Sequence, residues 1–229
     1  MTGFWNLPNL ISLSRIGLLC LAIMFLYNLF NTTLNLYLKI LAFITIPVIH
    51  LLDGLDGIVA RKFNQESEFG ALFDIAIDRL VELAFLFCFV DLHLIPLWIP
   101  LIILARGIIV DTIRGYGASK GFVGWGDKSM IRSRVLGFIV NSRFFRFVIE
   151  IKAIAFMLFA LYLVLADMII LNYTDIMGFS IVFIQDMVWI LAYVCLATFV
   201  FINLARGLPY LFAVGKLIEQ ENKEGNLKN

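Results

Sequence analysis

Long apolar runs, separated by short polar segments, make up most of the chain. Each run has about the 20 residues that an α-helix needs to cross the hydrocarbon core of a bilayer. The pattern predicts six membrane-spanning helices, at about residues 10–30, 36–60, 70–92, 96–114, 148–165 and 181–204. We therefore expect an all-α integral membrane protein, built as a bundle of six transmembrane helices.

The two ends of the chain predict less regular structure. Residues 2–7 contain two aromatic side chains suited to the headgroup region, which indicates a short interfacial helix. Pro8 and Asn9 predict a break before the first span, and Arg15 near the start of that span is expected to extend to the interface. The polar residues 219–229 are expected to form a solvated tail, and residues 1–229 to form a single membrane domain.

The composition agrees with a membrane protein. Hydrophobic residues make up 62% of the 229 positions and charged residues only 15%, which is too apolar for an ordinary soluble domain. The 22 phenylalanines are expected to face lipid. Cys20, Cys88 and Cys195 form no CxxC pair, so neither a disulfide framework nor a cysteine metal site is indicated. We expect the lipid bilayer as a partner and no nucleic acid.

The distribution of basic residues predicts the orientation in the membrane. Arg61, Lys62 and several basic residues of the polar segment 115–146 fall in loops on the side of the two termini. The opposite loops carry at most Lys39, together with acidic residues such as Asp167. By the positive-inside rule, both termini and the basic loops face the cytoplasm.

Four aspartates stand out against this apolar background. Asp53 and Asp56 lie three positions apart near the end of the second predicted helix, and Asp74 and Asp78 lie four apart at the start of the third. Such spacings place side chains on one side of a helix, and the short connection makes the two helices antiparallel neighbours. Carboxylates at membrane depth need a cation, and hard oxygen donors suit Mg²⁺ or Mn²⁺. We expect one or two divalent ions, two being the preferred number.

The residues around these acids resemble a family signature. They match D-x2-D-G-x2-A-R-x8-G-x3-D-x3-D of the CDP-alcohol phosphatidyltransferases with Asp53, Asp56, Gly57, Ala60, Arg61, Gly70, Asp74 and Asp78. Eight fixed residues over twenty-six positions make this resemblance specific. It implies that an alcohol attacks the β-phosphorus of a CDP-linked lipid, usually CDP-diacylglycerol, and that CMP leaves. It also implies a homodimer, since members of the family are commonly dimers.

The resemblance assigns roles to individual residues. Asp53, Asp56 and Asp74 would be metal ligands, and Asp78 would be the general base, also able to touch the second ion. Gly57 would let the nucleotide approach the backbone, and Arg61 would pair with the pyrophosphate. Weaker candidates for binding the CDP part are Ser67, Pro8, Asn9, Leu10 and Ile11.

The acceptor alcohol is less well defined. Arg106, Arg114 and Lys152 could form a basic pocket for a phosphorylated acceptor such as glycerol 3-phosphate, or could instead pair with acids and reach the interface. The segments 6–12 and 106–114 are similar to the bacterial phosphatidylglycerophosphate synthase branch, which implies a bacterial cytoplasmic membrane. Gly107 replaces the usual Glu of that branch, so inositol phosphate, serine and phosphatidylglycerol stay open as acceptors.

Three other interpretations of the aspartates are open. They could be buried partners of Arg61 and Arg79, or part of a cation pathway in a transporter, but neither explains the fixed glycines. A membrane prenyltransferase also binds a pyrophosphate through metal on Asp-rich helices, but would need a second, distant Asp-rich motif. We therefore expect an enzyme of phospholipid biosynthesis that releases CMP.

Overall fold

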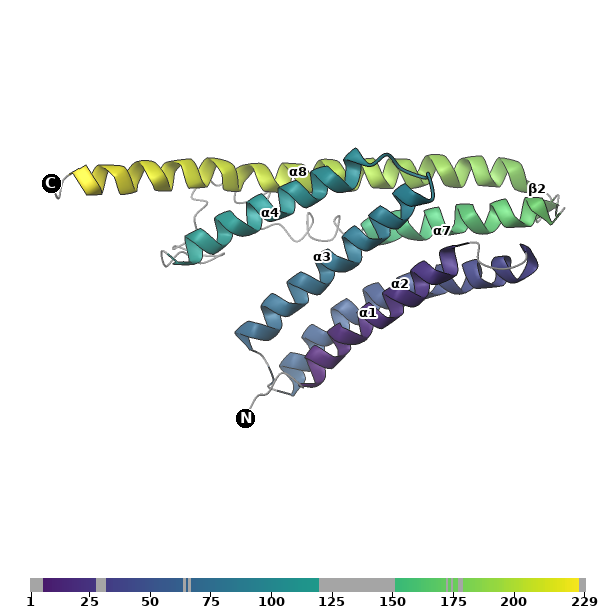
Figure 1. Cartoon of the computed structure of the whole chain (residues 1–229), viewed down its shortest axis with the longest axis horizontal. Helices are drawn as coiled ribbons and strands as arrows, with labels where there is room; N and C mark the ends of the chain where they lie inside the picture. The colour runs from purple at the N-terminus through teal and green to yellow at the C-terminus, as the bar shows by residue number, and fades with distance from the viewer. Residues whose placement is uncertain are drawn as a thin grey trace. The chain divides into compact units, whose positions relative to one another are not determined.

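The computed structural model describes residues 6–27, 32–63, 65, 67–119, 151–171, 173, 175–176 and 179–226. Its helices are α1 (Leu7–Leu26), α2 (Thr32–Lys62), α3 (Glu68–Asp91), α4 (Trp98–Ser119), α7 (Ile151–Ile170) and α8 (Ile181–Asn226) (Figure 1). Two short strands, β1 (Asp175–Ile176) and β2 (Phe179–Ser180), pair antiparallel between α7 and α8. Most of the predicted interfacial helix and of the basic segment 115–146 lies outside the described residues.

The prediction of an all-α membrane protein is confirmed. Four described helices are long and apolar enough to cross a bilayer, over Leu7–Leu26, Thr33–Lys62, Ile151–Ile170 and Ile181–Gly215. At about 1.5 Å per residue, α3 and α4 are also long enough, but they are not among these four candidate spans. The count of six spans therefore stays a prediction.

Two predicted boundaries are wrong. α1 begins at Leu7 and includes Pro8 in its first turn. Proline is tolerated there because the N–H groups of a helix's first turn have no intrahelical acceptor. α8 does not end at residue 204 but continues to Asn226 through Pro209. A proline inside a membrane helix is tolerated when neighbouring groups satisfy the carbonyl that it leaves free, so the helix extends into the segment expected to be a solvated tail.

The chain divides into two compact units. The first contains Met1–Leu97 and Lys152–Cys195, and the second contains Trp98–Ile151 and Leu196–Asn229. In the first unit, α1 packs against both α2 and α3, and Figure 1 shows it lying alongside α2. All four aspartates of the motif belong to this unit. The prediction of a single family domain stays a prediction.

Aromatic side chains form the core between α3 and α7. Phe85 and Phe89 of α3 and Phe156 and Phe159 of α7 are fully buried, with ring centroids 5.2–5.6 Å apart across the two helices. Offset or tilted ring pairs at such distances stabilise a core beyond the area that they bury. The expectation that the phenylalanines face lipid is therefore wrong for these four.

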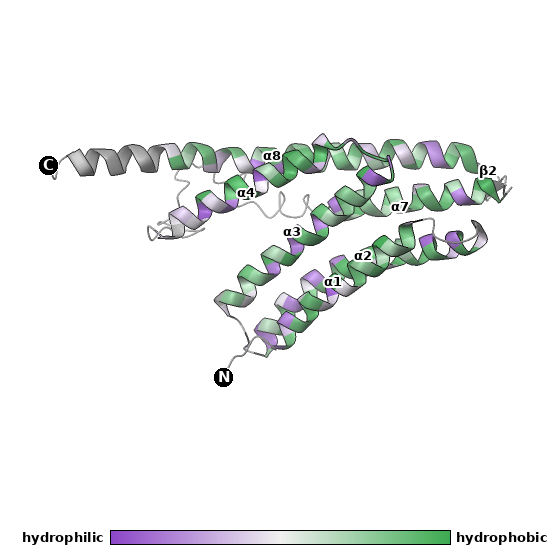
Figure 2. Ribbon diagram, viewed as in Figure 1, coloured by the Kyte–Doolittle hydropathy of each residue, from purple (hydrophilic) through white to green (hydrophobic). Residues whose placement is uncertain are grey.

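The outer surface of the described helices is strongly apolar. Figure 2 shows hydrophobic residues along most of α1, α2, α3 and α7. Large side chains such as Leu51 of α2 and Leu72 of α3 are more than two-thirds exposed without a membrane present. So much exposed apolar area is unusual for a soluble protein, and it agrees with insertion in lipid.

A buried ion pair joins α2 to α7. Lys39 Nζ lies 2.8 Å from Asp167 Oδ1, and the two side chains are 3% and 4% exposed. The prediction that Asp167 lies in a loop is wrong, because α7 continues to Ile170. Lys39, which was counted at most as a loop residue, lies inside α2. Their mutual neutralisation explains how two charges are accommodated inside the bundle.

Replacing Lys39 with methionine should strongly destabilise the protein. The change leaves Asp167 buried without its counter-ion, and Asp167 Oδ2 already makes no hydrogen bond. Breaking a buried pair in this way costs about 3–5 kcal/mol, which should appear as a lower melting temperature in detergent. The double variant Lys39→Met/Asp167→Leu should recover most of the loss; equal melting temperatures for single variant and parent would contradict this account.

Candidate active site

Arg15 of α1 lies at the centre of the acidic cluster. Its side chain is 1% exposed, although the sequence predicted that it would extend to the interface. That prediction is wrong because the guanidinium finds its partners inside the bundle, in the carboxylates of the two neighbouring helices. A buried cation is stable only when it is paired in this way.

All four aspartates of the motif surround this guanidinium. Arg15 Nη1 lies 2.5 Å from Asp53 Oδ1, 3.1 Å from Asp74 Oδ1 and 4.0 Å from Asp56 Oδ2. Arg15 Nη2 lies 3.8 Å from Asp78 Oδ1. The prediction that α2 and α3 bring these acids together therefore agrees with the structure, with one addition: α1 places a cation between them.

The donor set suits a hard cation. Four carboxylates from two helices converge on one point, and every atom they offer is a negatively charged oxygen. Around Arg15 they are spread more widely than around a metal ion: among the described residues, no three His, Cys, Asp or Glu side chains are placed to hold an ion together. The chemistry of the cluster fits a divalent ion, whereas its present spacing fits a guanidinium.

A second buried cation holds Asp78 from the other side. Lys152 Nζ of α7 lies 2.9 Å from Asp78 Oδ1, 3.2 Å from Asp78 Oδ2 and 3.1 Å from Glu82 Oε2. Lys152 is 3% exposed, and Glu82 also lies 3.5 Å from Arg79. These contacts fix the carboxylate of Asp78 between Lys152 and Arg15.

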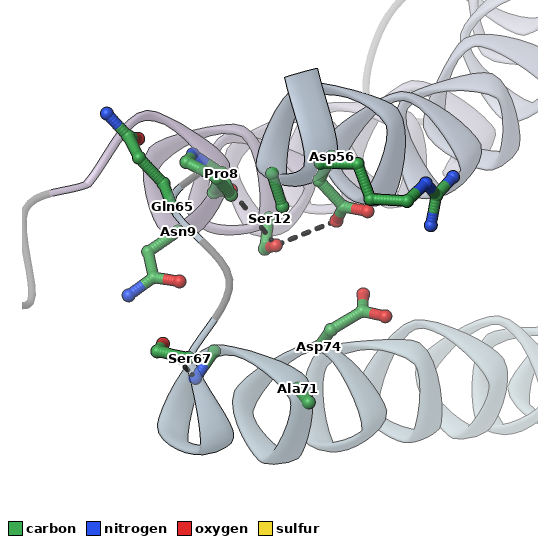
Figure 3. Close-up of a pocket in the computed structure, with 12 residues that line it drawn as sticks. Pro8, Asn9, Ser12, Asp56, Gln65, Ser67, Ala71 and Asp74 are labelled. Atoms are coloured by element: carbon green, nitrogen blue, oxygen red, sulfur yellow. Dashed lines mark hydrogen bonds between the residues drawn. The ribbon is translucent and has the colours of Figure 1, made fainter. Parts of the chain in front are cut away.

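A pocket of about 550 Å³ opens beside the cluster (Figure 3). It is lined by Pro8, Asn9, Ser12, Asp56, Gly57, Ala60, Arg61, Gln65, Ser67, Gly70, Ala71 and Asp74. These residues come from the start of α1, the end of α2, the start of α3 and the loop between α2 and α3. The pocket is of the size that small-molecule sites usually have.

Two acids of the motif face this pocket from opposite sides. Figure 3 shows the carboxylates of Asp56 on α2 and Asp74 on α3 pointing toward each other. Asp56 is 5% exposed and accepts a hydrogen bond of 2.8 Å from Ser12 Oγ, whereas the side chain of Asp74 is 41% exposed. A ligand in the pocket would therefore meet one fixed and one accessible carboxylate.

Most of the predicted nucleotide-binding residues reach the pocket. Gly57 contributes open backbone, since an added Cβ would meet nothing closer than the Arg61 guanidinium at 3.6 Å. Arg61 is exposed and lies one turn further along α2, over Gly57. Leu10 and Ile11 are not among the lining residues, because the helix directs Pro8, Asn9 and Ser12 to the pocket and the two residues between them elsewhere.

Ser67 has a structural role as well as a place in the pocket wall. It is the N-cap of α3, and its Oγ accepts a hydrogen bond of 2.9 Å from the backbone N–H of Gly70. A Cβ on Gly70 would lie 2.9 Å from Ser67 Oγ and 3.1 Å from Asn9 Oδ1. Only glycine allows α1 and the start of α3 to approach so closely.

Gly70→Ala should both weaken the cap and distort the pocket. Loss of an N-cap bond costs about 1 kcal/mol, so the melting temperature should fall, and displacement of Asn9 should raise the concentration of CDP-lipid needed for half-maximal turnover. Gly57→Ala is the matched control for stability, because its Cβ has room. A Gly70→Ala variant as stable as Gly57→Ala would show that the close approach is not constraining.

The predicted acceptor residues lie in different units. Lys152 belongs to the first unit and is engaged with Asp78 and Glu82. Arg106 and Arg114 belong to α4 in the second unit, where Arg106 packs on Gly207 of α8 and Arg114 lies 4.0 Å from Asp111. Grouping these three cations into one acceptor pocket stays a prediction.

The sequence matches the model of a known protein family over most of its length. The family model described as CDP-alcohol phosphatidyltransferase matches residues 5–184. The chain belongs to the CDP-alcohol phosphatidyltransferase family. This confirms the resemblance found in the aspartate motif, and the matched range includes every residue assigned to the site above.

Individual members of the family are moderately similar to the chain. A CDP-diacylglycerol–glycerol-3-phosphate 3-phosphatidyltransferase of Pseudomonas fluorescens is 32% identical over 119 residues, 51% of this chain and 58% of the relative. The enzyme of the same name from Bacillus subtilis is 32% identical over 131 residues, 52% of this chain and 65% of the relative. A CMP-forming cardiolipin synthase of Streptomyces coelicolor is 41% identical over 69 residues, 28% of this chain and 32% of the relative. The chain thus matches less than two-thirds of each relative's length.

Sequence reasoning missed two residues of this phosphatidyltransferase site. Ser12 and Arg15 lie four and seven positions after Pro8, so all three share one face of α1. That periodicity, together with the position of an arginine within an apolar run, was the sequence signal that could have placed both residues at the site. A charge placed there needs a partner, and the aspartate motif supplies the nearest excess of opposite charge.

Proposed function

We propose that this protein transfers a phosphatidyl group from CDP-diacylglycerol to glycerol 3-phosphate in phospholipid biosynthesis. The acceptor hydroxyl oxygen bonds to the phosphorus that carries diacylglycerol. The bond from that phosphorus to the bridging oxygen breaks, and CMP leaves with the electron pair. The hydroxyl proton passes to the carboxylate of Asp78.

The observation that carries this proposal is the convergence of the four motif aspartates beside an open pocket. Asp56, Gly57 and Arg61 line that pocket together with Asp74. Arg61 is exposed and supplies a planar donor suited to the pyrophosphate, and Gly57 leaves room for the nucleotide near the backbone. Asp78 lies among the converging carboxylates, where Arg15 and Lys152 keep its position fixed.

The enzyme would work with Mg²⁺ or Mn²⁺, for which the preferred number is two. Asp53, Asp56, Asp74 and Asp78 supply the oxygen donors. A bound divalent ion would polarise the phosphate oxygens and neutralise the charge that develops on them. The protein's own part is to hold the lipid pyrophosphate through Arg61, to orient the acceptor, and to accept its proton at Asp78.

Placement in the membrane follows from the same site. A liponucleotide can keep its acyl chains in the bilayer while its pyrophosphate enters the pocket at the ends of α1, α2 and α3. The proposal places six spans in a bacterial cytoplasmic membrane, and the charge pattern of the loops favours an orientation with the site and both termini on the cytoplasmic side. A homodimer is part of the proposal, because members of the family commonly form one.

Glycerol 3-phosphate is the preferred acceptor because two of the relatives above carry that acceptor in their name. Its phosphate would need basic partners, for which Arg106, Arg114 and Lys152 are the candidates. Inositol phosphate, serine and phosphatidylglycerol are the alternatives. The presence of a cardiolipin synthase among the relatives makes phosphatidylglycerol the alternative to test first.

An acceptor panel tests the proposal. Purified protein in mixed micelles is given CDP-diacylglycerol, Mg²⁺ and one alcohol at a time, and CMP and the lipid product are measured. CMP release that depends on glycerol 3-phosphate, with phosphatidylglycerophosphate as product, is the expected result. Release with another alcohol would overturn the acceptor but keep the reaction class. Failure to release CMP with any acceptor would overturn the function and favour a prenyltransferase or a transporter.

A further inference from the structure

We infer that Arg15 is an internal counter-ion of the metal site: it stabilises the four carboxylates before a divalent ion binds, and it competes with that ion. The inference rests on the proposed metal-dependent function. It concerns a residue outside the aspartate motif, on a helix that the motif does not include. Arg15 is a positioning residue in this scheme, because its contacts are to the carboxylates.

The first step is the contact geometry. The two terminal nitrogens of Arg15 lie within 4.0 Å of a carboxylate oxygen from each of Asp53, Asp56, Asp74 and Asp78. The guanidinium is thus in contact with the whole set of proposed metal ligands at once. The guanidinium of Arg15 and a bound metal ion would need the same carboxylate oxygens, so they cannot both keep all of these contacts.

The second step is charge. The four aspartates together can carry up to four negative charges, and Lys152 contacts Asp78 from the side of α7. Asp53, Asp56 and Asp74 each lie within 4.0 Å of Arg15, so removing Arg15 takes away a positive charge that these three carboxylates share. Carboxylates gathered around one point in this way repel one another, and the repulsion is stronger inside a protein than in water. Arg15 therefore removes the repulsion that would otherwise open the site in the absence of metal.

The third step is linkage. A group that stabilises the metal-free form and loses its contacts in the metal-bound form must weaken metal binding by the same free energy. Replacing Arg15 with glutamine should therefore have two opposite effects. The metal-free protein becomes less stable, and the affinity for the ion increases.

The test is Mn²⁺ binding and thermal stability, measured without substrate. Binding is followed by the electron paramagnetic resonance signal of free Mn²⁺, and unfolding is followed in chelator and in saturating Mn²⁺. Arg15→Gln should bind Mn²⁺ at least tenfold more tightly than the parent. Its melting temperature should fall in chelator and return toward that of the parent with Mn²⁺.

Lys39→Met is the matched control, since Lys39 is another buried cation of the same unit, paired with Asp167 outside the cluster. It should lose equal stability in chelator and in Mn²⁺ and keep the parent's affinity. If Arg15→Gln does not fold in chelator, Arg15→Lys serves instead: its compact charge cannot contact all four carboxylates, so its Mn²⁺ affinity should lie above that of the parent.

Two failures can be told apart. Equal or weaker Mn²⁺ binding in both Arg15 variants, with a parent that binds the ion, would overturn the counter-ion role alone. A parent that binds no Mn²⁺ would overturn the metal-dependent function and the inference that rests on it. Both readouts are independent of turnover, so the identity of the acceptor does not affect them.

Discussion

Asp78→Asn is expected to abolish turnover while leaving nucleotide binding measurable. Asparagine keeps the size of the side chain, and its amide oxygen can still accept from Lys152, which lies 2.9 Å from Asp78 Oδ1. The substitution removes the group that takes the proton from the acceptor hydroxyl, and it also removes one negative charge from the proposed metal ligands. General-base catalysis contributes about 10²–10⁴-fold to rate, so the CMP release rate should fall by that range.

Glu82→Gln is the control for this variant. Glu82 contacts the same lysine at 3.1 Å and lies one helical turn beyond Asp78, but it is not among the carboxylates around Arg15. Its turnover number should fall by no more than about tenfold, the smaller of the losses usual for a residue that only orients a site residue. Binding of CDP to both variants can be measured by calorimetry. Retained turnover in Asp78→Asn, or an equal loss in Glu82→Gln, would remove the proton-accepting role from Asp78.

The convergence of the aspartates could be predicted from sequence because it depends on helical spacing and a short connection. Asp53 and Asp56 share one side of α2, and Asp74 and Asp78 share one side of α3, whatever the rest of the bundle does. The fold class followed equally directly, since apolar runs of membrane-spanning length have few other solutions. Such features depend on local geometry alone.

The role of Arg15 could not be predicted in the same way. An arginine in the first turns of a spanning helix can either extend to the headgroups or pair within the bundle, and both satisfy its charge. Only the packing of α1 against α2 and α3 decides between them. The same limit applies to Asp167, for which its charge predicted a loop position, and which is buried in α7 because Lys39 of α2 neutralises it.

The aromatic core shows a further limit of sequence patterns. In a bilayer, a phenylalanine gains little from burial against protein over contact with lipid, so hydrophobicity does not tell which side it faces. Phe85, Phe89, Phe156 and Phe159 are buried because their rings fit one another across α3 and α7. Shape complementarity of this kind appears only once the helices are placed.

Asp56→Asn should produce the second large effect, this time through metal affinity. Asp56 is the most buried of the four acids, with 5% of its surface exposed, and its orientation is fixed by the 2.8 Å hydrogen bond from Ser12. Asparagine can accept the same hydrogen bond, so the substitution removes one charge and changes little else. Loss of one electrostatic group that stabilises the transition state costs on the order of 10²–10³ in rate.

The dependence of CMP release on Mg²⁺ concentration distinguishes this cause from misfolding. The half-maximal Mg²⁺ concentration should rise for Asp56→Asn, so that excess metal restores part of the rate. Its melting temperature in chelator should equal or exceed that of the parent, because one of four repelling carboxylates is gone. Ser12→Ala, which keeps the charge and loses only the hydrogen bond, should shift the metal requirement far less. A rate loss in Asp56→Asn with an unchanged metal requirement would mean that Asp56 acts on the substrate and not through a bound ion.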